Sequence, residues 1–126
     1  MLVLDSGGLT RLARRDRATA ALLLAFRRRG LWPATVPTVV LAESLTGSGR
    51  RDANTNRLLK ACEIRPTVSE SVARHAARLR ASARRGSAVD ALVVAVAEPG
   101  STILTSDGGD LRALAEGATD VHVEIV

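Results

Sequence analysis

The chain has 126 residues, of which 46% are hydrophobic, so it is long and apolar enough to fold as one domain around its own core. One cysteine and two widely spaced histidines exclude a disulfide framework and argue against a zinc site. Aromatic residues make up 2%, which argues against a stacking platform for bases. The net charge of +5 favours phosphate-bearing partners, and arginine suits phosphate geometry.

Short apolar runs alternate with helix-like segments along the whole chain. We expect strands at 1–4, 31–36, 63–67, 101–105 and 121–126. Helices are expected at 9–15, 17–29, from 37 onward, 54–62, 70–85, 88–97 and from about 110 to 116. This alternation predicts an α/β fold, a three-layer α/β/α sandwich with a central parallel sheet, formed by residues 1–126 as a single domain.

Neither a membrane span nor a signal peptide is visible in the sequence. No apolar stretch reaches the length of a membrane-crossing helix, and the N-terminus lacks a basic region followed by a cleavage site. We therefore expect a cytoplasmic protein with no membrane partner.

Two aspartates come after apolar strands. Asp5 ends the run Met1–Leu4, and Asp107 follows the strand expected at 101–105. Ligands of parallel sheets bind at the carboxyl ends of the strands. Asp5 and Asp107 are therefore expected at the same edge of the sheet.

Two further carboxylates lie in apolar helices. Glu43 shares a helix face with Val39 and Val40, which places it on the side expected to face the core. Asp90 lies in the first turn of a helix that is apolar on every side, after Ser87 at the capping position. A buried carboxylate costs several kcal/mol unless it is paired. Asp90 alone is explained equally well by the helix dipole or by a functional charge.

Asp107 and Asp110 have the spacing of a helix-capping pair, and capping is the better explanation for these two alone. Taken together, however, four or five carboxylates at one place would repel one another and raise each other's pKa. A divalent cation removes that conflict, and ligands that are all oxygen select Mg²⁺ or Mn²⁺.

The order of these motifs resembles a known family. The segments that carry the resemblance are Leu4-Asp5-Ser6, Leu41-Ala42-Glu43, Ser87-Ala88-Val89-Asp90-Ala91 and Thr105-Ser106-Asp107-Gly108-Gly109-Asp110-Leu111. Together they resemble the PIN domain, and within it the VapC toxin ribonucleases of type II toxin–antitoxin systems. The resemblance covers essentially the whole chain. Gly7-Gly8 after the first aspartate and the link Glu98-Pro99-Gly100 depart from the usual pattern.

The resemblance implies a metal-dependent endoribonuclease that uses Mg²⁺ or Mn²⁺. It implies Asp5, Glu43, Asp90 and Asp107 as the acidic quartet, Asp110 as a further metal-site carboxylate, and Ser6 and Ser106 as hydroxyls that orient the ligands. It also implies a VapB-type antitoxin and a homodimer. Arginines that could guide the RNA substrate are Arg11, Arg14, Arg15, Arg84 and Arg85.

Three other functions remain open at this point. A PIN nuclease of RNA processing or decay would carry the same motifs without an antitoxin. An inactive binding module is disfavoured by the intact acidic quartet. A phosphate-accepting receiver-like domain is disfavoured because it needs adjacent acidic residues after its first strand, as well as a lysine after a later strand, whereas Lys60 is the lysine of this chain.

Overall fold

The computed structural model describes residues 1–66 and 68–126, and within these ranges the chain forms seven α-helices and one five-stranded sheet. The strands are β1 (Leu2–Leu4), β2 (Thr35–Pro37), β3 (Glu63–Arg65), β4 (Ser101–Thr105) and β5 (Val121–Ile125). The helices are α1 (Ser6–Leu12), α2 (Arg17–Arg28), α3 (Thr38–Ser44), α4 (Ala53–Leu59), α5 (Glu70–Ala83), α6 (Ala88–Ala97) and α7 (Gly109–Ala115).

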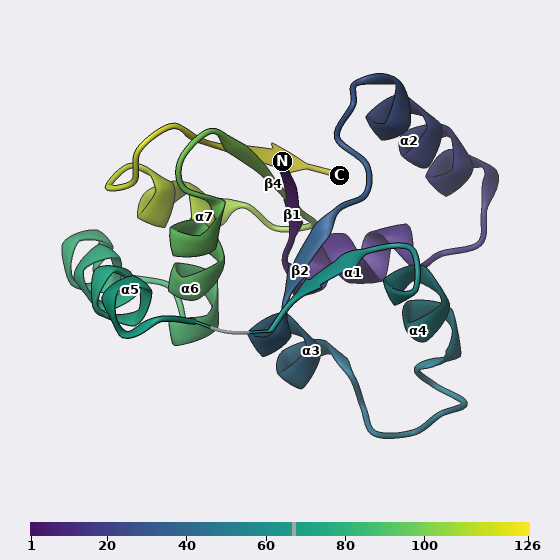
Figure 1. Cartoon of the computed structure of the whole chain (residues 1–126), viewed down its shortest axis with the longest axis horizontal. Coiled ribbons are helices and arrows are strands. Elements are labelled where there is room, and N and C mark those ends of the chain that lie inside the picture. The colour runs from purple at the N-terminus through teal and green to yellow at the C-terminus, as the bar shows by residue number, and fades with distance from the viewer. Residues whose placement is uncertain (67) are drawn as a thin grey trace.

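The sheet is parallel and lies between two layers of helices. Its strand order is β3-β2-β1-β4-β5. Helices α6 and α7 pack on one side with α5 outside them, and α1 packs on the other side with α2 and α4 beyond it (Figure 1). The three-layer α/β/α sandwich with a central parallel sheet is therefore confirmed.

Strand β1 lies at the centre of the sheet, next to the point where the strand order reverses. From β1 the chain continues to β2 and β3 on one side, whereas β4 pairs on the other side and is followed by β5. In open α/β sheets a crevice forms at the carboxyl ends of the strands at such a point. Helix α3 lies at this level and contacts both α1 and α6. The crevice between β1 and β4 is thus the expected place for a site.

The core is aliphatic, as the composition predicts. All three residues of β1 are fully buried, and six of the ten residues of α6 are buried. Phe26 of α2 is the largest fully buried side chain. The sheet and α6 therefore form a rigid support under the carboxyl edge.

Several expected boundaries were wrong, each for a local reason. Helix α1 spans Ser6–Leu12 instead of 9–15, because the Asp5 carboxylate caps it by accepting the Gly8 N–H. Strand β2 begins at Thr35, after the stretch that contains Pro33. Strand β3 ends at Arg65, before Pro66, which has no N–H to donate. The end of the expected strand 63–67, residue 67, lies outside the described residues.

Helix α2 is more exposed to solvent than its sequence predicts. We expect Ala20, Leu23, Leu24 and Phe26 to face inward, but Leu24 is 46% exposed and Ala20 is also exposed. The reason is the position of α2, which lies beyond α1 at the periphery (Figure 1). Among the described residues, no helix is both long enough and apolar enough to span a membrane.

Candidate active site

Asp5 is a buried carboxylate at the carboxyl end of the central strand. It is 7% exposed. Its Oδ1 accepts the Gly8 N–H at 2.7 Å and its Oδ2 accepts the Thr105 hydroxyl at 2.6 Å. Burial raises the pKa of Asp5, these two hydrogen bonds partly offset the rise, and the negative charges of Asp90 and Glu43 raise it further. Asp5 is therefore oriented firmly while its charge is only partly compensated.

Thr105 is the residue that the sequence did not reveal. Strands β1 and β4 pair with Leu4 opposite Leu104, so the next residues, Asp5 and Thr105, lie side by side. The Thr105 hydroxyl donates to Asp5 and accepts the N–H of Asp107 at 3.2 Å. Thr105 precedes Ser106-Asp107 in the sequence, but its role depends on the register of two distant strands.

Asp90 caps helix α6 and also lines the carboxylate cavity. The Ser87 hydroxyl accepts the Asp90 N–H at 3.0 Å, and Asp90 Oδ2 accepts the Ser87 N–H at 3.0 Å. This reciprocal capping box begins α6. Asp90 is half-buried, and its charge acts on Asp5. Asp90 therefore caps α6 and lies close enough to Asp5 for its charge to raise the pKa of that carboxyl.

Glu43 is exposed, so the expectation that it is buried among apolar side chains was wrong. Val40, one turn earlier on α3, is buried. Helix α3 is short, and the same face passes from core to solvent within one turn at the edge of the sheet. The charge of Glu43 nevertheless raises the pKa of Asp5. Glu43 therefore lies at the rim of the site rather than in its floor.

Asp107 and Asp110 do not form the expected capping pair. Helix α7 begins at Gly109 after Gly108, which provides no side-chain cap. Asp107 Oδ1 accepts the Gly109 N–H at 3.3 Å, and Asp110 Oδ1 accepts from Arg85 Nε at 2.7 Å. Asp107 is exposed and Asp110 is half-buried. Asp107 is thus open to solvent, whereas Asp110 is paired with Arg85.

One cavity of about 210 Å³ collects most of these groups. It is lined by Asp5, Ser6, Gly7, Asp90, Thr105, Ser106, Asp107, Asp110 and Leu111. Thus four carboxylates from three regions of the chain line one cavity, and Glu43 is not among its lining residues. Ser6 and Ser106 also line it, whereas the side-chain hydroxyl that donates to Asp5 is that of Thr105.

The two glycines after Asp5 allow α1 to approach β4 closely. A Cβ on Gly8 would lie 2.1 Å from the Leu104 carbonyl oxygen, and one on Gly7 would lie 2.3 Å from Ser106 Oγ. Gly7-Gly8, a departure from the usual family pattern, is therefore required by this tight contact. The contact places the start of α1 against the carboxyl end of β4.

The donor set fits a hard divalent cation. Every polar side chain that lines the cavity offers oxygen, which Mg²⁺ and Mn²⁺ prefer. Within residues 1–66 and 68–126, no three carboxylate, imidazole or thiol groups are close enough to enclose an ion by themselves. Mg²⁺ usually keeps several waters and is held by one or two carboxylates. The separation of these side chains is compatible with that mode of binding.

The arginines expected to guide RNA lie at two places. Arg11 donates to Thr19 Oγ1 at 2.6 Å and is half-buried between α1 and α2, while Arg14 and Arg15 follow the far end of α1. Arg84 and Arg85 lie at the end of α5, and Arg85 contacts Asp110 directly. The second group is therefore adjacent to the carboxylate cavity.

Comparison with known families agrees with this geometry. The family model of the PIN domain matches residues 2–117. The chain belongs to the PIN domain family. PIN domains are nucleases, so the family implies hydrolysis of phosphodiester bonds. The matched region contains all the carboxylates described above.

Several solved structures match nearly the whole chain. PAE2754 from Pyrobaculum aerophilum has a TM-score of 0.64 at 16% identity, covering 94% of this chain and 87% of that one. FitAB bound to an IR36 DNA fragment has a TM-score of 0.66 at 18% identity, covering 98% and 94%. FitAcB from Neisseria gonorrhoeae has a TM-score of 0.63 at 19% identity, covering 97% and 96%. A comparison with curated proteins finds no match.

Proposed function

We propose that this PIN domain is an endoribonuclease that hydrolyses RNA phosphodiester bonds with Mg²⁺ or Mn²⁺. The observation that carries the proposal is the buried Asp5, whose pKa is raised by burial and by the charges of Asp90 and Glu43. A cavity carboxylate whose pKa is raised in this way is a feature of functional sites. A bound divalent cation would compensate it.

The carboxylates of the site would have different roles according to their positions. Asp5 and Asp90 would hold the cation, with Glu43, Asp107 and Asp110 completing the site directly or through water. When bound, the cation supplies the charge that activates a water and stabilises the phosphate oxygens during in-line attack. A carboxylate oxygen of Glu43 or Asp107, both exposed, would accept the proton of the attacking water.

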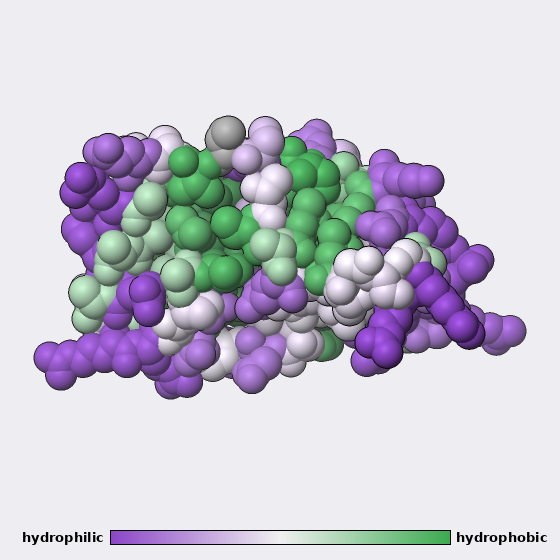
Figure 2. All heavy atoms as spheres, turned by 90° about the horizontal axis from the view of Figure 1, so that it is seen from below, coloured by the Kyte–Doolittle hydropathy of each residue, from purple (hydrophilic) through white to green (hydrophobic). Residues whose placement is uncertain are grey.

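We further propose that the chain is the toxin of a VapBC-type pair in the cytoplasm, with a VapB-type antitoxin as its inhibitor. The order of the acidic motifs supports this, as does the fold shared with FitAB and FitAcB. A homodimer is part of the same proposal. Figure 2 shows apolar side chains gathered in the middle of the face seen from below, the side on which α3 and α6 lie in Figure 1. Light scattering of the purified chain measures the oligomeric state.

The experiment that tests the activity incubates the purified chain with structured RNAs, with Mg²⁺, with Mn²⁺ or with a chelator. Cleavage is expected with either cation and is abolished by the chelator. Asp5→Ala and Asp90→Ala should each reduce cleavage by about 100-fold or more, because several kcal/mol of charge stabilisation is removed. Asp120→Asn, an exposed aspartate that does not line the cavity, should cleave like the wild type. Equal cleavage by all variants would overturn the site.

A further inference from the structure

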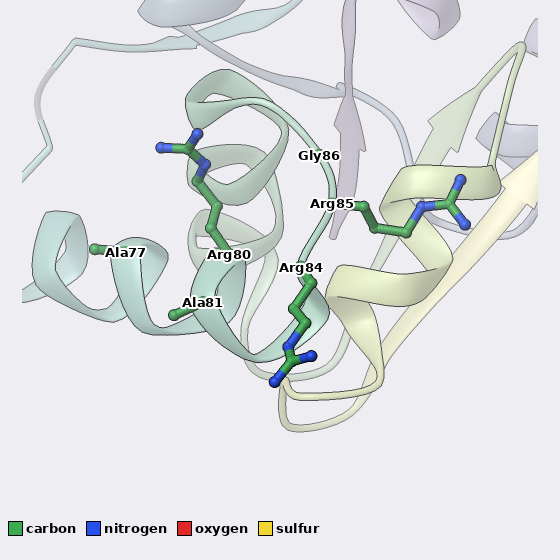
Figure 3. Close-up of a pocket in the computed structure, with 6 residues that line it drawn as sticks. All are labelled: Ala77, Arg80, Ala81, Arg84, Arg85 and Gly86. Atoms are coloured by element: carbon green, nitrogen blue, oxygen red, sulfur yellow. The ribbon is translucent and has the colours of Figure 1, made fainter.

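A second cavity, of about 410 Å³, lies at the end of α5, next to the carboxylate cavity. Its lining residues are Ala77, Arg80, Ala81, Arg84, Arg85 and Gly86 (Figure 3). Ala77 and Ala81 lie one turn apart on α5, and their short side chains leave the helix face hollow. The lining contains three arginines and no carboxylate, so the cavity is strongly positive.

Two of the three guanidinium groups are not neutralised by a partner. Arg80 and Arg84 are exposed and form no ion pair within the described part of the chain. Arg85, in contrast, donates to Asp110 at 2.7 Å. The Arg85–Asp110 pair therefore lies between a positive cavity and a negative one.

The connection between α5 and α6 keeps the two cavities adjacent. Gly86 has φ of +90°, and a Cβ there would lie 2.7 Å from Leu114 Cδ1 of α7. The next residue, Ser87, is bound reciprocally to Asp90. The corner that carries Arg84 is thus packed against α7 and joined directly to a site carboxylate.

Arg84 has an unusual backbone for an arginine. It ends α5 in the left-handed conformation with φ of 55°, a position that helices usually give to glycine or asparagine. Strained positions of this kind cluster at functional sites. The left-handed backbone therefore indicates a role for the Arg84 side chain, because glycine would adopt this conformation at lower cost.

We propose that Arg80 and Arg84 bind backbone phosphates of the RNA strand whose scissile bond enters the carboxylate cavity. This proposal rests on the proposed ribonuclease function and adds the path of its substrate. The Arg80 and Arg84 guanidinium groups point in different directions from the end of α5 (Figure 3). That spread suits successive phosphates along a strand better than one small anion. Arginine contacts of this kind are independent of base identity.

The test measures binding and cleavage separately. A labelled single-stranded RNA is titrated with the chain in chelator, by fluorescence anisotropy, over a range of salt concentrations. Arg80→Gln and Arg84→Gly should each weaken binding several-fold and lower the slope of log K against log salt by about 0.7 for each phosphate that is no longer bound. Arg57→Gln on α4 changes the net charge equally and should leave both quantities near the wild-type values.

Cleavage kinetics and stability provide the controls. With Mg²⁺, the two cavity variants should raise KM and leave kcat unchanged, because the phosphates bound by these arginines are held equally in the ground state and the transition state. Arg84→Gly should unfold at a temperature no lower than the wild type, because glycine accepts the left-handed conformation. Weaker binding by this variant then cannot be explained by unfolding.

The outcomes distinguish this proposal from the one on which it rests. Cleavage of RNA with binding and KM identical in Arg80→Gln, Arg84→Gly and Arg57→Gln would overturn the phosphate site and leave the ribonuclease intact. Arginine-dependent binding without any cleavage would support the phosphate site and overturn the ribonuclease. A wild-type chain that neither binds nor cleaves RNA would overturn both.

Discussion

The Thr105 hydroxyl donates a 2.6 Å hydrogen bond to Asp5 Oδ2 and so joins the ends of β4 and β1. Thr105 is 1% exposed, and Asp5 also accepts the Gly8 N–H. The carboxylate is therefore held from two sides, by the neighbouring strand and by the start of α1. Groups that orient a metal ligand usually contribute strongly to affinity and activity.

Removal of this hydroxyl should weaken the site without removing any carboxylate. We expect Thr105→Val, which has nearly the same shape, to lower metal affinity or cleavage by roughly 10- to 100-fold. Thr105→Ser keeps the hydroxyl and should stay much closer to the wild type. Isothermal titration with Mn²⁺ and the RNA cleavage assay measure the two effects. A valine variant as active as the serine variant would contradict the orienting role.

Asp5 should destabilise the metal-free fold at neutral pH. Burial and nearby negative charges raise the pKa of Asp5, so the protonated form of Asp5 stabilises the fold. This stabilisation is complete below the pKa that Asp5 has in the unfolded chain. That contribution is lost as the pH rises through the raised folded-state pKa. In chelator at neutral pH, Asp5→Asn is therefore expected to unfold at a higher temperature than the wild type.

Addition of Mg²⁺ should reverse that order by stabilising the wild type and not Asp5→Asn. Asp120→Asn is the matched control, since Asp120 is exposed at φ of 53°, a conformation that asparagine also tolerates. It should follow the wild type in both conditions. Thermal unfolding followed by circular dichroism measures the stability of each protein in both conditions. An Asp5→Asn variant that is less stable than the wild type in chelator would contradict the expectation.

Substitution of Gly8 should destabilise the fold because α1 and β4 are in close contact there. In Gly8→Ala the new Cβ would meet the Leu104 carbonyl oxygen at 2.1 Å, and backbone cannot move aside as a flexible side chain can. We expect a loss of about 1–3 kcal/mol of unfolding free energy. Gly49→Ala, where a Cβ has no neighbour within 4 Å, should be close to neutral. Urea titration of both variants decides whether the contact is as tight as described.

Asp52 should stabilise the loop before α4 in a pH-dependent way. Its carboxylate accepts the N–H groups of Thr46 and Gly47 and the Thr46 hydroxyl. The Thr46 N–H contributes most to lowering the pKa of Asp52. The resulting stability is present above the pKa of the unfolded chain and is lost as the pH falls through the lowered folded-state pKa.

Asp52→Asn replaces a charged acceptor with a weaker one, so it should be less stable than the wild type at neutral pH. The difference should shrink as the pH is lowered through the acidic range, where the wild-type carboxylate becomes protonated. Thermal unfolding of both proteins across that range measures the difference. A gap that stays constant with pH would show that the charge of Asp52 is not what holds the loop.

The expectations that α6 is mostly buried and that Ser87 caps it are confirmed, because both depend on information within one helix. The apolar run and Ser87 are neighbours of Asp90 in sequence, and their spacing determines both the burial of α6 and the capping box. Glu43 shows the limit of the same reasoning. Glu43 does follow Val40 by one turn of the same helix. The expectation of burial failed because this spacing does not show that the end of α3 projects past the rim of the site.

By itself the sequence determined the alternation of strands and helices, the aliphatic core and the arrival of Asp5 and Asp107 at one edge of the sheet. These follow from short-range patterns and from the rule that parallel strands end on the same side. The tertiary structure alone decided that Thr105 binds Asp5, that Asp110 pairs with Arg85 and that Arg80 and Arg84 line a cavity beside the site. Each of those depends on strand register or helix packing between distant segments, which local pattern does not encode.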